Sequence, residues 1–178
     1  MKSERESFEM RWARDVIARA GIATESPDPE DLERRAERLT PEQIATRDLI
    51  VARAKEVAAE NSTLAYDLAL ALHFMEFHTD AIEILNLAPS TPSIDWLRLD
   101  LMIFARLFVD ALSEATRLEE IYAADPESAF ASTYARAHAL KGLGQEEMAV
   151  DLLRGLVRVR PGYKSAQSFL MDWSGGDE

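Results

Sequence analysis

Alanines recur along this chain of 178 residues at a spacing that few folds produce. Six of them form two evenly spaced series, Ala71, Ala105 and Ala139, and Ala81, Ala115 and Ala149, which share one period. Longer matches appear at twice that period, since YDLALAL at 66–72 aligns with YARAHAL at 134–140, and AIEIL at 81–85 with AVDLL at 149–153. Similarity at a fixed period is the signature of repeat proteins, in which each unit packs on the next. The alignment that makes the alanines of each series equivalent is called the even register below.

Regular breaks divide the same region into segments of helical composition. Alanine, leucine, glutamate and arginine dominate, and no stretch keeps up the apolar–polar alternation of a strand. The breaks are HTD, PSTP, DP and RPG, beginning at residues 78, 89, 125 and 160. They predict helices over 62–77, 80–88, 94–107, 109–124, 127–142 and 145–159. A final helix, with Phe169 and Trp173 among its apolar residues, is expected to follow.

The N-terminal part of the chain, 1–61, has no match to the repeat. Ser3 can cap a first helix that ends near Gly21, with an apolar stripe of Phe8, Trp12, Val16 and Ile17. Such a helix could pack on the array, dimerise or dock on a partner. A short charged helix is expected at 30–39. Three start signals, Thr40, Pro41 and Gln43, then predict a helix to about Asn61.

Paired helices with this period resemble the tetratricopeptide repeat (TPR), whose units are about 34 residues long. The third unit carries the resemblance best. Ala137 and Ala149 stand at the family's small-residue positions in the first and second helix, Leu140 at a large-residue position, Gly144 at the turn and Pro161 at the closing position. The first unit offers Ala69, Leu72, Ala81, Leu85 and Ala88. Small residues let two antiparallel helices approach closely, and larger ones interlock around them.

Some positions depart from the TPR pattern. Ala65 and Thr133 stand where the family has an early tryptophan, and the even register puts Arg106 and Glu119 where apolar residues belong. Taking Ala111 as the helix-packing alanine suits the middle unit better but breaks the period. The alternative to a TPR-like array is an irregular α–α superhelix.

The expected fold class is all-α, a TPR-like superhelix of about three hairpins. We expect an N-terminal helical extension at 1–61, the repeats at 62–161, a capping helix at 162–173 and a flexible tail at 174–178.

Net charge is −12, and most of it lies in the middle of the chain. Residues 63–126 carry 11 acidic and 3 basic side chains, a balance of −8. Such a segment repels nucleic acids and anionic membranes but not a basic protein partner. The chain has no cysteine, no apolar run long enough to insert directly into a membrane, and no signal-peptide core at its start. A cytoplasmic protein is therefore expected.

No motif in the sequence favours catalysis or a cofactor. The GLG string at 142–144 lacks the Lys-Ser/Thr of a phosphate loop and is interpreted as a hairpin turn. The chain has three histidines, His73, His78 and His138, and none stands in a zinc-binding motif. We expect no catalytic residue, no cofactor and no metal ion, and hence a protein that is not an enzyme.

TPR domains bind partners on a concave face lined by the first helix of each hairpin. In the even register, the resemblance assigns eight candidate residues to a partner-binding groove: Tyr66, Leu70, His73, Phe74, Asp100, Tyr134, His138 and Lys141. Tyr66 and Phe74 could equally belong to the core, and Phe104 and Phe108 are expected in the core. The lysine and asparagine with which some TPR domains grip a C-terminal carboxylate are missing.

The resemblance implies an adaptor or scaffold that binds a protein or peptide. A basic partner would be compatible with the acidic middle segment of the chain. A homodimer is also compatible with the sequence. The alternative is a carrier of one aggregation-prone client, like the small, acidic TPR-like chaperones of bacterial type III secretion.

Overall fold

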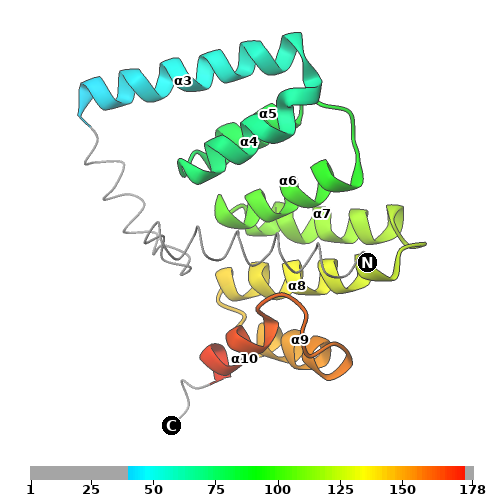
Figure 1. The fold of residues 1–178 in the computed structure, drawn as a ribbon. Helices are drawn as coiled ribbons and strands as arrows, with labels where there is room; N and C mark the ends of the chain where they lie inside the picture. Colours follow the sequence, from blue (N-terminus) through cyan, green and yellow to red (C-terminus); the bar gives the residue numbers. More distant parts are fainter. Residues whose placement is uncertain (1–39, 175–178) are drawn as a thin grey trace. The chain divides into compact units, whose positions relative to one another are not determined.

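The computed structural model describes residues 40–174, all of whose regular elements are helical. The chain divides into two compact units, Met1–Ile44 and Ala45–Glu178. The helices expected at 3–21 and 30–39 lie outside the described residues, as does most of the expected tail. Figure 1 shows the described helices in chain order: α3 (Pro41–Glu60), the short 3₁₀ helix η1 (Ser62–Leu64), α4 (Ala65–Phe74), α5 (His78–Leu85), α6 (Pro92–Phe104), α7 (Phe108–Ile121), α8 (Pro126–Gly142), α9 (Glu146–Val159) and α10 (Ala166–Ser174).

Local signals set the helix starts. The predicted capping box begins α3, since the backbone N–H of Thr40 donates to Gln43 Oε1 at 2.8 Å and that of Gln43 donates to Thr40 Oγ1 at 3.3 Å. Thr91 and Asp125 cap α6 and α8 with a side-chain oxygen that accepts from the backbone N–H of Ile94 and Glu127, and each is followed by a proline in the first helical turn. The six predicted repeat helices are confirmed, with ends that differ from the prediction by less than one helical turn.

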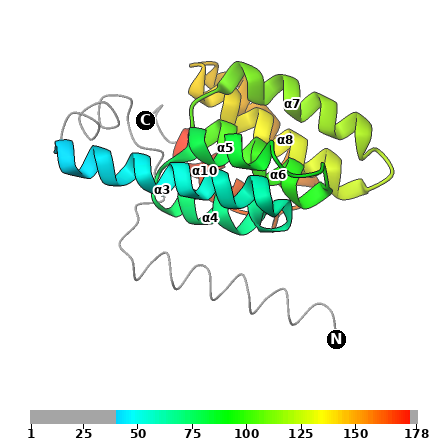
Figure 2. The ribbon, with the colours of Figure 1, turned by 90° about the horizontal axis from the view of Figure 1, so that it is seen from above.

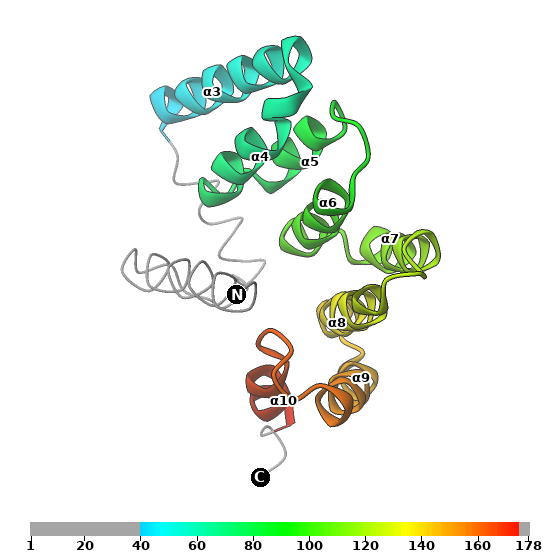
Figure 3. The same ribbon diagram turned by 45° about the vertical axis from the view of Figure 1, so that its right-hand side comes forward.

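The second unit is an all-α, TPR-like array of three helical hairpins: α4 with α5, α6 with α7, and α8 with α9. From α4 to α9 each helix packs against the next one in the chain, and α10 packs on α9. Figure 3 shows that α4, α6 and α8 lie on the inner side of an arc, while α5, α7 and α9 lie on its outer side. Figure 2 shows the same helices from above.

The three hairpins share one turn geometry. In each, a backbone N–H reaches back to a carbonyl five positions earlier: Phe77 to Leu72 at 2.9 Å, Leu107 to Met102 at 2.8 Å, and Gln145 to Leu140 at 2.9 Å. The residue before each donor has a left-handed φ, 66° at Glu76, 61° at Arg106 and 75° at Gly144. This is the Schellman ending of a helix, so the GLG string is the predicted turn.

These turns correct the register of the middle repeat. The hydrogen bonds make Ala81, Ala111 and Ala149 equivalent, so the first interval is shorter than the second, whereas the even register made them equal. The predicted middle position, Ala115, lies one helical turn farther along α7. The interval varies because α5 and α6 have 8 and 13 residues, whereas α7 and α8 have 14 and 17. The match between the first and third units, at twice the period, holds.

Alanines let the helices pack closely. Ala69, Ala81, Ala115, Ala137 and Ala149 are fully buried, and leucines and isoleucines fill the space between them. Gly142 serves the same purpose, because a Cβ there would lie 2.2 Å from Cζ of Phe108 on α7.

Candidate functional site on the inner face

The corrected register defines equivalent positions on the inner helices. Position by position, the sets are Tyr66, Trp96 and Tyr134; Leu70, Asp100 and His138; His73, Ile103 and Lys141; and Phe74, Phe104 and Gly142. Asp100 stays on an inner helix but is equivalent to Leu70 and His138, one helical turn from the position that the even register gave it.

One aromatic cluster joins the first two hairpins. The Phe104 ring centroid lies 4.8 Å from that of His73 and 5.5 Å from that of His78, and Phe74 lies beside His73 at 5.7 Å. Phe104, expected in the core, is 42% exposed. Phe74 is 59% exposed, so the cluster offers aromatic surface to a partner.

The two histidines of this cluster meet because α4 ends between them. Their Nδ1 atoms are 3.1 Å apart, so one imidazole donates its N–H and the other accepts. Burial lowers the pKa of His73, and burial with the neighbouring His73 lowers the pKa of His78 to about 4. Both rings are therefore neutral at pH 7.

A charged pair lies between the second hairpin and the loop before α10. The Lys164 ammonium is 3.7 Å from Asp100 Oδ2 and 5.0 Å from the centroid of the Tyr134 ring. The surrounding protein raises the pKa of the Asp100 carboxyl, although Lys164 opposes this and 43% of the side chain meets water, which limits the increase. Burial also raises the pKa of Tyr134, and that of Tyr163 to about 12. Both phenols are neutral.

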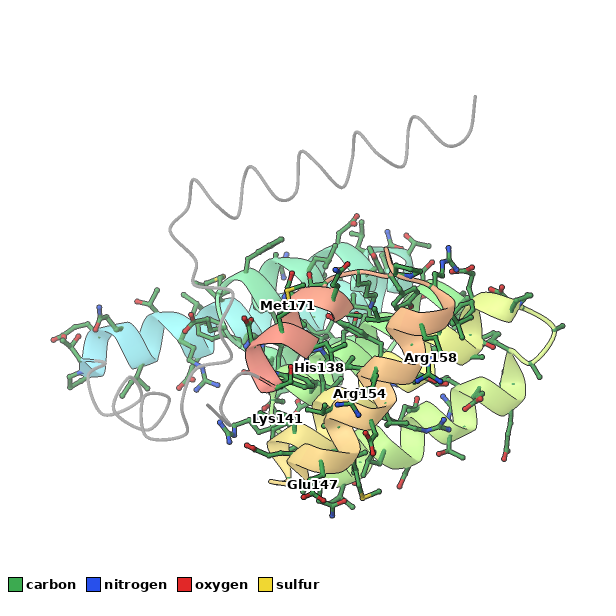
Figure 4. The ribbon with its side chains drawn as sticks, turned by 90° about the horizontal axis from the view of Figure 1, so that it is seen from below. His138, Lys141, Glu147, Arg154, Arg158 and Met171 are labelled. Carbon is green, nitrogen blue, oxygen red and sulfur yellow. The ribbon has the colours of Figure 1, made fainter. Side chains whose placement is uncertain are left out.

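His138 lies under α10 in a cage of aromatic rings. Its ring centroid is 4.5 Å from Tyr134 and, edge to face, 4.7 Å from Phe169 and 5.1 Å from Trp173. Its buried Nε2 has no hydrogen-bond partner. Burial and the nearby Lys164 lower its pKa to about 4. Figure 4 shows His138 and Lys141 on α8 beside α10, which carries Met171.

The structure places the other predicted groove residues as follows. Tyr66 is 36% exposed and Leu70 is half-buried. Lys141 Nζ is 2.6 Å from Glu146 and 5.8 Å from the centroid of the Trp173 ring. Tyr134 and His138 are half-buried beneath α10. The openly exposed aromatic surface is therefore concentrated on the first two hairpins.

Sequence reasoning missed the contribution of Lys164 and His78 to this surface. Lys164 follows the last predicted break and carries no motif, and its left-handed φ of 42° is set by the loop. His78 stands in the sequence only as one of three histidines outside any zinc-binding motif. The helix end at Phe74, which the turn pattern could have indicated, brings the two rings together.

The groups that the inner face offers to a partner are aromatic rings and charged side chains. Within residues 40–174, no group of three His, Asp or Glu side chains is placed to hold a metal ion. In the same range, no helix combines the length and apolar character needed to cross a membrane. Flat aromatic rings beside a half-exposed ion pair can hold an extended or helical peptide by stacking and hydrogen bonds.

Comparison with known proteins gives a structural likeness. No protein-family model matches the sequence, and no curated protein matches it. Among solved structures, the NMR structure of the first TPR domain of the human RPAP3 protein is similar at a TM-score of 0.49 and 16% identity. The match covers 66% of this chain and 92% of that one.

Proposed function

We propose that this protein is a non-catalytic adaptor that binds a protein or peptide on its inner face. The observation that carries the proposal is the exposed aromatic side chains Tyr66, Phe74 and Phe104 on α4 and α6, together with Asp100 of α6 in its half-exposed pair with Lys164. Aromatic side chains are enriched among the residues that dominate binding energy at interfaces. The partner is a segment with aromatic or aliphatic side chains and a basic group that can reach Asp100.

The test is capture of partners from a lysate of the native host, using the full chain as bait. The wild type is compared with Tyr66→Ala/Phe74→Ala, and circular dichroism establishes that the variant stays folded. The matched control is Ile121→Ala/Val159→Ala, which removes two exposed apolar side chains from the outer helices. We expect proteins that the wild type and the control retain and that the inner-face variant loses. Equal capture by all three baits would contradict inner-face binding.

The same captured proteins separate an adaptor from a single-client chaperone. An adaptor binds two folded partners at once, so both appear together and each is soluble by itself. A chaperone holds one client that aggregates when expressed without it. Coexpression of each captured protein with and without this chain distinguishes the two functions.

A further inference from the structure

Three hairpin turns lie in a row along one edge of the array. This turn edge comprises residues 75–80, 105–110 and 143–148, and Figure 1 shows the three turns at the left-hand ends of the hairpins. Neighbouring turns adjoin through rings: His78 lies 5.5 Å from Phe104 at the end of α6, and Phe108 packs on Gly142 at the end of α8. Each of the first two turns thus contacts the end of the helix that leads into the next turn.

The turn edge exposes large apolar side chains. Five of them are between 39% and 66% exposed: Met75, Leu107, Val109, Leu143 and Met148. Single exposed apolar residues are ordinary on a protein surface, but a contiguous group marks an interaction site. None of these five is among the inner-face residues proposed to bind a partner.

The turn edge is rich in acidic side chains. Five acidic residues and one basic residue, Arg106, fall within it; the acidic ones are Glu76, Asp80, Asp110, Glu146 and Glu147. Asp80 is paired with Arg47 and Lys55 of α3 and Glu146 with Lys141 of α8, whereas Asp110 and Glu147 are exposed. Figure 4 shows Glu147 at the turn end of α9, with Arg154 and Arg158 farther along the helix.

The helix starts explain the acidic residues but not the apolar ones. Carboxylates in the first turns of α5, α7 and α9 stabilise the positive end of each helix dipole. Val109 and Met148 occupy the same first turns, where a polar residue would serve the helix equally well without exposing apolar surface to water. Exposed apolar side chains between carboxylates are complementary to an amphipathic segment that carries lysine or arginine.

We propose that the turn edge is a second docking surface, which binds a cationic amphipathic helix of a partner protein. Its apolar side would cover Val109 and Met148, and its basic residues would pair with Asp110 and Glu147. A second copy of this chain is a poor occupant, because it presents the same acidic edge and a net charge of −12. The turn edge borders the inner face at Phe74 and Phe104, so a chain that docks one partner on each surface can hold two partners side by side.

The probe is a fluorescent peptide of leucine and lysine, about 18 residues or five helical turns long, arranged as an amphipathic helix. Anisotropy with the full chain measures its Kd, and a leucine–glutamate peptide of the same pattern is the control. We expect the lysine peptide to bind and the glutamate peptide not to bind. Val109→Ser/Met148→Ser should raise the Kd about tenfold, the scale of loss when apolar contact residues are truncated at an interface.

The matched control uses the opposite ends of the same two helices. Ile121 and Val159 are 55% and 70% exposed, against 66% and 56% for Val109 and Met148, so Ile121→Ser/Val159→Ser removes similar exposed surface. This control should leave the Kd unchanged. Asp110→Asn/Glu147→Gln should raise the Kd and flatten its dependence on salt, because two ion pairs are lost.

Several results would overturn the proposal. One is that the lysine peptide does not bind. Another is that Val109→Ser/Met148→Ser and Ile121→Ser/Val159→Ser raise the Kd equally, which would show unspecific attraction of the peptide to an acidic protein. A wild-type dimer that Val109→Ser/Met148→Ser dissociates, measured by light scattering, would assign the edge to a second copy. Tyr66→Ala/Phe74→Ala should bind the peptide like the wild type. If this variant alone loses binding, the peptide lies on the inner face instead, so the two surfaces are tested independently.

Discussion

Asp95 is a carboxylate with no exposure to solvent, and it joins both helices of the middle hairpin. Ser90 Oγ and the Tyr122 hydroxyl donate to Oδ2 at 2.5 and 2.6 Å, and Arg98 donates to Oδ1 at 2.7 Å. Burial alone would raise the pKa of Asp95, but these hydrogen bonds and the charge of Arg98 hold it below its ordinary value. A buried charge that is fully paired in this way is costly to disturb.

Replacing this carboxylate by an amide tests its importance. In Asp95→Asn, one oxygen remains to accept three donors, and Arg98 loses its buried partner. We expect a loss of about 3 kcal/mol in the free energy of unfolding, which lowers the Tm by roughly 6–12 °C for a chain of this length. Thermal unfolding followed by circular dichroism measures it. Asp67→Asn, at an exposed position of α4, should change the Tm little; equal shifts in both variants would contradict the special role of Asp95.

At the scale of helices, α9 depends on close contact with α8. Ala149 is fully buried near the start of α9, whereas its neighbour Met148 is 56% exposed. In Ala149→Glu a charge enters a tight helix contact with no partner, so we expect a loss on the order of 3–5 kcal/mol and unfolding of the third hairpin. Urea denaturation measures this, and Met148→Glu is the control on the same helix. An unchanged denaturation midpoint in Ala149→Glu would show that the packing register of this hairpin is wrong.

The helices were predictable from the sequence because their boundaries depend on local chemistry. Thr91 with Pro92, Asp125 with Pro126, and Gly144 act within a short distance of their own position. The register of the middle repeat was not predictable in this way. Both Ala111 and Ala115 are buried on α7, and the expectation of an even spacing favoured the second. The left-handed turn positions that decide between them, Glu76 and Arg106, are not glycines, so the sequence has no comparable signal there.

The candidate site was predicted only in part. Residues on the inner side of α4, α6 and α8 follow from helix periodicity once the hairpins are known. The contact of Lys164 with Asp100 joins positions that are far apart in the sequence, and the cage around His138 depends on where α10 packs. Such contacts arise from tertiary packing, so no local pattern announces them.

At the scale of the whole molecule, the three histidines couple stability to pH. Burial is the main cause that lowers the pKa of each, and the values for His78 and His138 fall to about 4. In the unfolded chain a histidine titrates at about 6.5. Between pH 6.5 and 4 the unfolded chain therefore binds more protons than the folded one, and stability falls as the pH falls. Asp100, whose pKa is raised, opposes this trend in the lower part of the window.

The variant His138→Phe separates the contribution of one histidine. Phenylalanine fits among Tyr134, Phe169 and Trp173, carries no buried nitrogen without a partner and takes up no proton. We expect a stability at pH 7.5 equal to or above that of the wild type, and a smaller loss between pH 6.5 and 4. Urea denaturation at a series of pH values measures both. Hydrogen bonds hold the pKa of both Asp95 and Glu114 low, from Ser90, Tyr122 and Arg98 to Asp95 and from Arg117 and Arg98 to Glu114. Below pH 4 these carboxylates become protonated, and both proteins should lose stability in parallel. If the stability of the wild type and of His138→Phe also changes in parallel between pH 6.5 and 4, His138 is protonated without cost in the folded protein, and its burial does not make stability depend on pH.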